Sequence, residues 1–156
     1  MQHNLFESFI LVANRLNIDF SIEPLLYGSL GLERVTNINL DPEDIDILIP
    51  QEFIEDRWED LKCLMTELGY ILIDLREHQF SNHDVKVAFA KIEELKEFAG
   101  IEINEIQSII ENETEYKLLN LKQYLHVYKQ SSIDGYRKVK KNNKDTEKIK
   151  LIESII

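Results

Sequence analysis

One stretch of sequence decides the fold: Glu43-Asp-Ile-Asp-Ile-Leu-Ile-Pro50. Its apolar residues predict a strand over residues 44–49, which Pro50 ends. Successive side chains of a strand point to opposite faces, so Asp44 and Asp46 are expected on one face and the isoleucines on the other. Two neighbouring carboxylates repel each other unless a cation lies between them. The pair therefore indicates a metal site.

The segment upstream supplies a second feature. The apolar run Leu25-Leu-Tyr27 predicts a short buried strand, which Gly28-Ser29 and Gly31 break. A carboxylate pair beside a turn that can accept phosphate is the minimum set for nucleotidyl transfer. The alternative is a half-exposed strand with an acidic outer face, and a Gly-Ser turn present for its conformation alone.

The composition argues against some partners. The chain has 156 residues, with 29 acidic against 18 basic side chains and a net charge of −11. Binding to a nucleic-acid backbone needs clustered Lys and Arg, so a long nucleic acid is not an expected partner. A metal-bound nucleotide is compatible with this charge, because the metal supplies positive charge locally.

The sequence also indicates a cytoplasmic protein. Cys63 is the single cysteine, so it cannot form an internal disulfide. No apolar run approaches the roughly 20 residues that span a bilayer, and no membrane partner is expected. The N-terminal residues Met1-Gln-His-Asn4 lack the basic start of a secretory signal. The oligomeric state is left open.

Hydrophobic periodicity predicts the other elements. They are a helix over residues 5–16, a polar loop or short helix over 33–43, and a helix over 54–68 that Gly69 ends. Strands over 70–75 and 84–90, joined by a hairpin loop over 76–83, follow, and then a short helix over 92–98 that Gly100 ends and a mainly helical chain from residue 116. This order predicts an α/β (α+β) fold with a mixed sheet flanked by helices and a helical C-terminal tail. We expect a single domain over residues 1–156, with the sheet over about 20–100 and the tail over about 115–156.

The spacing of these features resembles that of a known family. Gly28-Ser29, fourteen further residues and then Asp44-Ile-Asp46 are similar to the signature of the nucleotidyltransferase superfamily related to DNA polymerase β. Within it, the chain most resembles the small bacterial branch that includes lincosamide and aminoglycoside nucleotidyltransferases. The helical segment after the sheet in that branch is similar to three stretches here: Leu121-Lys-Gln-Tyr-Leu-His-Val-Tyr128, Asp134-Gly-Tyr-Arg137 and Lys144-Asp145.

This resemblance implies a mechanism and its residues. Gly28 and Ser29 would bind the triphosphate of a nucleotide through backbone N–H groups and a hydroxyl. Asp44 and Asp46 would be catalytic residues that hold one or two Mg²⁺ ions against the phosphates. Pyrophosphate would leave, and a nucleoside monophosphate would pass to an acceptor hydroxyl.

The family usually supplies a third carboxylate from a later strand, as a metal ligand or general base. The best candidate is Asp84, in Asn82-His-Asp-Val-Lys-Val-Ala-Phe89, where it is expected to begin a strand. The alternatives are that Asp84 lies in the preceding hairpin as a turn residue, or that Asp74 or Glu93 supplies the third carboxylate. Asp84 is therefore expected to join Asp44 and Asp46 as a catalytic residue and metal ligand.

Basic residues near these motifs have two interpretations. Lys86, which falls on the same strand face as Asp84, and Lys144 are expected to bind the nucleotide, and Arg137 and Lys148 could also neutralise phosphate charge. Solvated faces of the fold are the alternative for all four.

The favoured function is a Mg²⁺-dependent nucleotidyltransferase that moves a nucleoside monophosphate from an NTP to a hydroxyl of a small-molecule or protein acceptor. The alternative is a non-catalytic member of the fold that binds a nucleotide or a partner protein, such as one component of a toxin–antitoxin pair. A third carboxylate beside Asp44 and Asp46 would distinguish the two.

Overall fold

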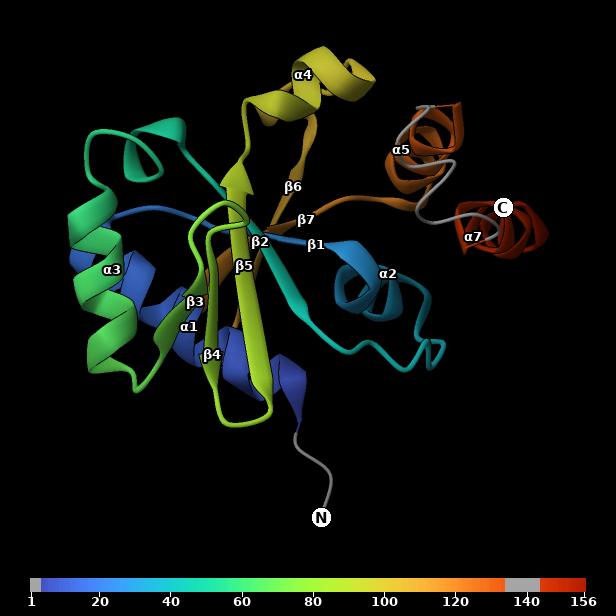
Figure 1. The fold of residues 1–156 in the computed structure, drawn as a ribbon. Coiled ribbons are helices and arrows are strands. Elements are labelled where there is room, and N and C mark those ends of the chain that lie inside the picture. The colour runs from blue at the N-terminus through green and yellow to red at the C-terminus, as the bar shows by residue number, and fades with distance from the viewer. Residues whose placement is uncertain (1–3, 134–143) are drawn as a thin grey trace.

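Seven strands form one mixed sheet in the part of the chain that the structure, a computed structural model, describes: residues 4–133 and 144–156 (Figure 1). Their order across the sheet is β3-β4-β5-β2-β1-β7-β6. The strands are β1 (Leu25–Tyr27), β2 (Ile45–Ile49), β3 (Ile71–Asp74), β4 (Gln79–Asn82), β5 (Val85–Lys91), β6 (Gln107–Glu111) and β7 (Thr114–Leu118). The predicted α+β class with a mixed sheet is therefore confirmed.

The centre of the sheet mixes strand directions. Strand β2 is antiparallel to β1 and parallel to β5, while β1 is parallel to β7. The register places Asp46 of β2 opposite Tyr27 of β1 on one side and Ala88 of β5 on the other. This register later decides which side chains lie beside Asp46.

Helices cover both faces of the sheet (Figure 1). The helical segments are α1 (Leu5–Phe20), α2 (Gly28–Thr36), η1 (Gln51–Phe53), α3 (Trp58–Glu67), α4 (Glu94–Ala99), η2 (Ile103–Glu105), α5 (Leu121–Ile133) and α7 (Lys144–Ile155). Helices α1 and α3 pack on one face, and α2, α5 and α7 lie on the other. Helices α5 and α7 confirm the expected helical C-terminal part, but it begins at Leu121, whereas residues 116–118, which were expected to be helical, belong to strand β7.

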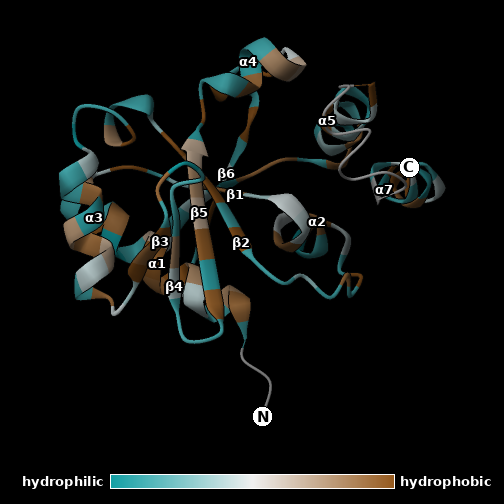
Figure 2. Ribbon diagram, viewed as in Figure 1, coloured by the Kyte–Doolittle hydropathy of each residue, from teal (hydrophilic) through white to brown (hydrophobic). Residues whose placement is uncertain are grey.

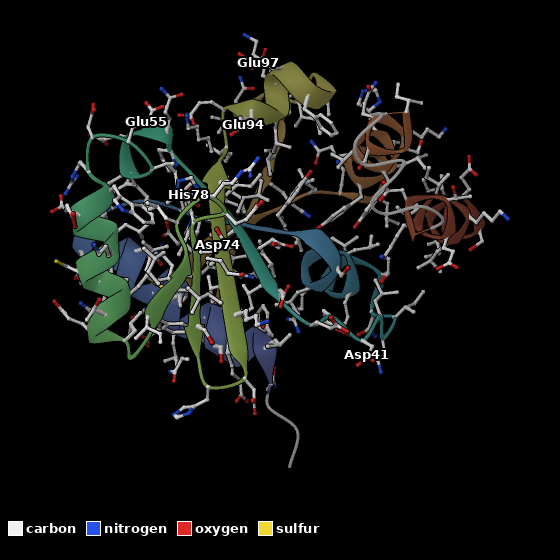
Figure 3. The ribbon with its side chains drawn as sticks, viewed as in Figure 1. Asp41, Glu55, Asp74, His78, Glu94 and Glu97 are labelled. Carbon is white, nitrogen blue, oxygen red and sulfur yellow. The ribbon has the colours of Figure 1, made fainter. Side chains whose placement is uncertain are left out.

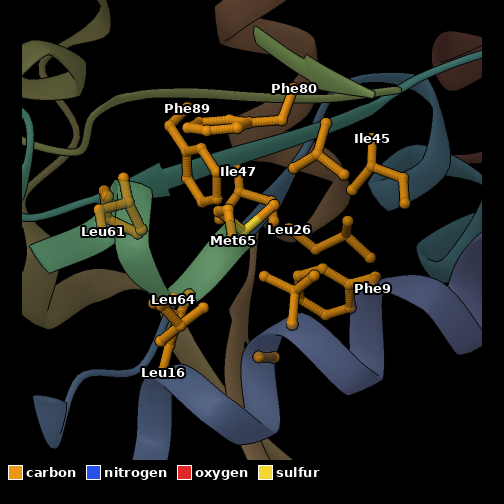
Figure 4. Close-up of a cluster of buried hydrophobic side chains, with 14 of the residues drawn as sticks. Phe9, Leu16, Leu26, Ile45, Ile47, Leu61, Leu64, Met65, Phe80 and Phe89 are labelled. Carbon is orange, nitrogen blue, oxygen red and sulfur yellow. The ribbon is translucent and has the colours of Figure 1, made fainter. Parts of the chain in front are cut away.

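Alternation along β2 divides the buried side chains between two cores. Ile45 and Ile47 belong to the cluster that α1 and α3 cover, shown in Figure 4, whereas Leu48 packs in the second cluster with α4, α5 and α7. Each large apolar side chain that is fully buried contributes about 1.5–3 kcal/mol. Helix α3 carries hydrophobic and hydrophilic bands in Figure 2, as expected for a helix with one buried face.

Two boundaries follow the sequence signals closely. Gly69, with φ +92°, comes directly after the last turn of α3, and Gly100, with φ +66°, ends α4. Glycine adopts this left-handed backbone without the penalty that a Cβ brings. The predicted ends of both helices are confirmed.

Strand β4 lies inside the expected hairpin loop 76–83, so that prediction was wrong. Its four residues, Gln79–Asn82, hold one buried apolar side chain, Phe80, and this is too little for a period-two signal. As a consequence Asp84 occupies the turn between β4 and β5, and β5 begins one residue later.

The sheet also extends beyond the expected range. Strands β6 and β7 form a hairpin over residues 107–118, where the sequence analysis placed no strand. Its turn is made by Asn112 (φ +55°) and Glu113 (φ +60°). Two-residue hairpin turns with positive φ usually carry glycine at the second position, and that signal is missing here.

Two further findings complete the fold. Residues 28–36, expected as a turn followed by a polar loop or short helix, form α2 from Gly28 onward. Within residues 4–133 and 144–156, no helix has the length and apolar character needed to cross a membrane.

Candidate functional site

An open cleft of about 650 Å³ lies where α2 begins. Its sheet side is formed by β2 and β5, and its helical wall comes from α5 and α7. The residues singled out by sequence that line it are Gly28, Ser29, Asp44, Asp46 and Lys148. The structure therefore brings the Gly-Ser turn and the carboxylate pair to one cleft.

Gly28 and Asp46 are in close contact. A Cβ at Gly28 would lie 3.3 Å from the Cβ of Asp46 and would overlap its Oδ2. Gly28 also has φ +65°, a conformation that residues with a side chain rarely adopt. Glycine at position 28 therefore lets the Asp46 carboxylate lie against the first residue of α2.

A tyrosine on α5, Tyr124, contacts the backbone at the start of α2. The hydroxyl of Tyr124 donates a hydrogen bond of 3.1 Å to the backbone oxygen of Gly28. Gly31 makes room for it, since a Cβ there would overlap the Tyr124 hydroxyl and lie 2.6 Å from the backbone oxygen of Leu26. Burial, together with nearby Tyr128, Tyr27 and Asp46, raises the pKa of Tyr124 well above its usual value, so the hydroxyl remains a donor.

The first two residues of α2, Gly28 and Ser29, line the cleft. In the described part of the chain, Tyr27, which precedes the helix, gives no side-chain capping hydrogen bond. The first N–H groups of a helix have no partner within the helix, and the helix dipole makes this end attractive to anions. Half-buried Ser29 lines the cleft in this turn.

The cleft is strongly acidic. Among the described residues that line it, Lys148 is the one basic side chain, against seven carboxylates: Asp41, Glu43, Asp44, Asp46, Glu77, Asp145 and Glu147. Figure 3 shows Asp41 on the loop that leads from α2 toward β2. An anionic ligand therefore needs a cation with it to bind here.

The donor set fits Mg²⁺. This ion usually keeps several waters and binds through one or two carboxylates together with phosphate oxygens of a substrate, rather than through a cage of protein ligands. Asp44 and Asp46, both half-buried, supply two such carboxylates to the cleft, and Asp46 lies against Gly28 at the start of α2. They are the residues that would hold the ion.

Asp84 does not join them. It is exposed in the β4–β5 turn and lines a separate, smaller hollow with Tyr70 and His83. Ala88 is the residue of β5 that pairs with Asp46, and Asp84 comes four residues before it. Four residues of extended strand separate Asp84 from Ala88 by about 13 Å. Residues 4–133 and 144–156 contain no group of three or more His, Cys, Asp or Glu side chains that could hold a metal ion, so the expected convergence of Asp84 on the pair is not found.

The two alternatives for a third carboxylate have other contacts. The Asp74 carboxylate, at the end of β3 (Figure 3), accepts a hydrogen bond of 3.1 Å from the backbone N–H of Glu77. Glu93 accepts one of 2.9 Å from the backbone N–H of Gln51. Neither residue lines the cleft. The position on β5 beside Asp46 is filled by half-buried Ala88.

The predicted basic residues are only partly placed. Lys86 is exposed on β5 and does not line the cleft, although it shares a strand face with Ala88. The side chain of Lys144, the first residue of α7, and the whole of Asp134–Arg137 lie outside the described part. Lys148, one turn further along α7, lines the cleft.

The structure adds two residues that sequence reasoning missed. The hydroxyl of Tyr124 reaches the backbone oxygen of Gly28, and nothing in the spacing of this residue along its helix shows that contact. Asp145, only 3% exposed, lines the cleft from the first turn of α7. An acidic residue in a first turn is normally explained by the helix dipole, so its burial could not be foreseen.

Comparison with known proteins gives one full-length relative. No protein-family model matches this chain. The chain is 45% identical over 152 residues to the uncharacterized protein YnaI of Bacillus subtilis (strain 168), and the match covers 97% of each chain. Identity at this level over nearly the whole length means that the chain belongs to the same family as YnaI.

Proposed function

We propose that this protein is a Mg²⁺-dependent nucleotidyltransferase, which moves a nucleoside monophosphate from an NTP to a hydroxyl of a small-molecule or protein acceptor. One observation carries the proposal: the Asp46 carboxylate packs against Gly28 at the N-terminus of α2. A carboxylate suited to a metal ion and N–H groups suited to phosphate therefore meet at one point.

The chain binds the triphosphate at this corner. The first N–H groups of α2 and the Ser29 hydroxyl donate hydrogen bonds to phosphate oxygens, as helix N-termini do for anions. The hydrogen bond from Tyr124 to the Gly28 oxygen keeps the turn in place. Lys148 adds a positive charge from α7.

Asp44 and Asp46 hold Mg²⁺ against the phosphates. When bound, the ion polarises the α-phosphate and neutralises charge on the attacking and leaving oxygens. The acceptor oxygen forms a bond to the α-phosphorus, the bond from that phosphorus to the bridging oxygen of pyrophosphate breaks, and the hydroxyl proton passes to water or to a carboxylate of the cleft. The acidic lining also disfavours binding of an NTP without its metal.

A second candidate rests on Ala88. A strand position beside Asp46 could have supplied a third carboxylate, and here it carries a methyl group. A protein with the same cleft could bind a metal–nucleotide complex without efficient transfer, and act as a binding module for a partner protein. Turnover, rather than binding, separates the two candidates.

The acidic composition supports a nucleotide donor and an acceptor other than a long nucleic acid. Because NTPs are cytoplasmic metabolites and Cys63 is an exposed free thiol, we also infer a cytoplasmic location.

Two measurements test the proposal. The first is the melting temperature with Mg²⁺ and non-hydrolysable analogues of ATP, GTP, CTP and UTP in turn, since a ligand at a hundred times its dissociation constant adds about 2.7 kcal/mol of stability. The second is transfer of label from α-labelled ATP, GTP, CTP and UTP to a panel of hydroxyl acceptors that includes the protein itself, with Asp46→Asn as the control. Stabilisation with transfer supports the enzyme, and stabilisation without transfer supports the binding module. No stabilisation by any of the nucleotides would exclude both.

A further inference from the structure

Phe98 stands out among the aromatic residues of the chain. It lies on α4, lines the cleft and is 37% exposed. Within residues 4–133 and 144–156 it is the one aromatic side chain among the large hydrophobic residues that are exposed. No contact of Phe98 with another aromatic ring is found among those residues, and part of its side chain is exposed where it lines the cleft.

Of the other aromatic residues that line the cleft, Phe89, Tyr124 and Tyr128 are buried, and Tyr27 at the end of β1 is half-buried. Tyr124 and Tyr128 on α5 stack on each other, with ring centroids 6.0 Å apart and planes 16° apart, and both are buried. The ammonium group of Lys148 lies 5.7 Å from the centre of the Tyr128 ring. These rings stabilise the packing of α5 against α7 and are not placed to receive a flat ligand.

The surface between Asp46 and Phe98 is lined by small side chains. Ala88 lies beside Asp46, and Ala90 lies beside Leu48 one pleat further along the parallel strands β2 and β5. Alternate residues share a face, so both alanines line the cleft, about 7 Å apart. Helix α4 follows the end of β5, which places Phe98 beyond Ala90 and away from Asp46. A molecule with its phosphates at Gly28 can therefore extend over the two alanines to Phe98.

We propose that Phe98 stacks on the base of the nucleotide, and this inference rests on the proposed function of the same cleft. Every nucleobase has a flat π-face that stacks on an aromatic ring. Ala88 and Ala90 carry only methyl groups, so we expect the area of the base that stacks on Phe98 to decide its affinity. Purine nucleotides are therefore preferred to pyrimidine nucleotides, with little distinction between adenine and guanine.

The test compares two ligands in each variant by isothermal titration calorimetry: a non-hydrolysable ATP analogue and inorganic tripolyphosphate, both with Mg²⁺. In Phe98→Ala the dissociation constant of the ATP analogue should rise about tenfold, the scale of one base–aromatic stack, while that of tripolyphosphate stays unchanged. Phe98→Leu, which keeps apolar volume but removes the flat face, should resemble Phe98→Ala, and Phe98→Tyr should resemble the wild type. Ile103→Ala is the matched control, because Ile103 is 40% exposed on η2 and does not line the cleft.

Each outcome has one meaning. Equal affinity of the ATP analogue for the wild type and Phe98→Ala overturns the stacking role while the proposed function stands. A loss of tripolyphosphate affinity in Phe98→Ala also overturns it, because the residue would then act on the phosphate end. If the wild type binds neither ligand, the proposed function fails and this inference fails with it.

Discussion

The side chain of Asp46 fills the space that any side chain at Gly28 would need. A Cβ built on Gly28 overlaps Asp46 Oδ2 and lies 3.3 Å from Asp46 Cβ and Cγ. The two residues come from neighbouring antiparallel strand ends, where Tyr27 pairs with Asp46. The contact therefore ties the start of α2 to the carboxylate proposed to hold the metal.

Gly28→Ala should lower both stability and nucleotide affinity. A left-handed backbone costs an L-residue about 1–2 kcal/mol, and the new methyl group also displaces the Asp46 carboxylate. Gly100→Ala is a matched control, since Gly100 has φ +66° and a Cβ there would meet no atom within 4 Å. In Gly100→Ala, thermal unfolding should show a loss of stability from the backbone strain, while titration with a Mg²⁺–nucleotide analogue should show unchanged affinity. Equal losses of stability in the two variants, with nucleotide binding intact in both, would show that the Asp46 side chain moves aside for the new methyl group without affecting the site.

Asp46→Asn should abolish divalent-dependent transfer while leaving the fold intact in metal-free buffer. Asp44 and Asp46 line the same cleft among other carboxylates, so deleting one negative charge relieves repulsion and leaves stability unchanged or slightly raised. Melting temperatures measured in EDTA and in Mg²⁺ check this. Asp84→Asn, in the exposed β4–β5 turn, should change neither activity nor the response to Mg²⁺. A marked loss of stability of Asp46→Asn in EDTA would instead identify Asp46 as a structural residue.

Ser29→Ala should weaken NTP binding by about 1–2 kcal/mol, the scale of one hydrogen bond to a charged acceptor. Stability should change little, because alanine is well tolerated in the first turn of a helix. Ser154→Ala, near the end of α7, is the control. It removes a hydroxyl that donates a hydrogen bond of 2.6 Å to the Leu151 backbone oxygen outside the cleft, and this variant should bind NTP with wild-type affinity. Identical NTP affinity in both variants would mean that the Gly-Ser turn is conformational only.

Local sequence signals predicted the centre of the molecule. The alternation of polar and apolar residues placed β2, and the glycines placed the turn at its neighbour β1 and the ends of α3 and α4. These features depend on residues close together in the chain, where period and turn chemistry act directly. The meeting of Gly28 with Asp46 followed from two such strands lying side by side.

The third-carboxylate prediction failed for a non-local reason. The register of β5 against β2 is set by burial of Val87 and Phe89 on the face that α1 and α3 cover. That register puts Ala88 beside Asp46 and leaves Asp84 in a turn, and no local pattern reports which residues of two strands become neighbours. The polar strand β4 and the burial of Asp145 were missed for the same reason, because both depend on tertiary packing.

Tyr124→Phe should make the protein less sensitive to alkali. Burial raises the pKa of Tyr124 well above its usual value, so the folded protein keeps this proton at a pH where the unfolded chain, with a tyrosine pKa near 10, has lost it. The contribution to stability is complete below pH 10 and falls as the pH rises above it. The variant should lose about 1 kcal/mol at neutral pH, since the Gly28 oxygen loses its donor. Denaturant unfolding between pH 8 and pH 11 should show a shallower decline in the variant, and an unchanged slope would contradict the burial of this hydroxyl.

Ala88→Asp should raise the rate of nucleotidyl transfer above that of the wild type. Ala88 is half-buried, lines the cleft and pairs directly with Asp46 across the parallel strands, at the spacing of about 5 Å between neighbouring strands. A carboxylate there adds a third oxygen donor for a divalent ion and a base for the acceptor hydroxyl. Without metal, the same substitution should lower the melting temperature, because it brings another negative charge beside Asp46.

Ala88→Asn is the control of equal size. It should show neither the loss of stability without metal nor the gain in transfer rate. The measurements are Mg²⁺ affinity, melting temperature in EDTA and label transfer from an NTP. Tighter Mg²⁺ binding with faster transfer in Ala88→Asp alone would show that the wild-type cleft is a nucleotidyl-transfer site with one carboxylate fewer. The same rate in all three proteins would show that position 88 does not limit the reaction.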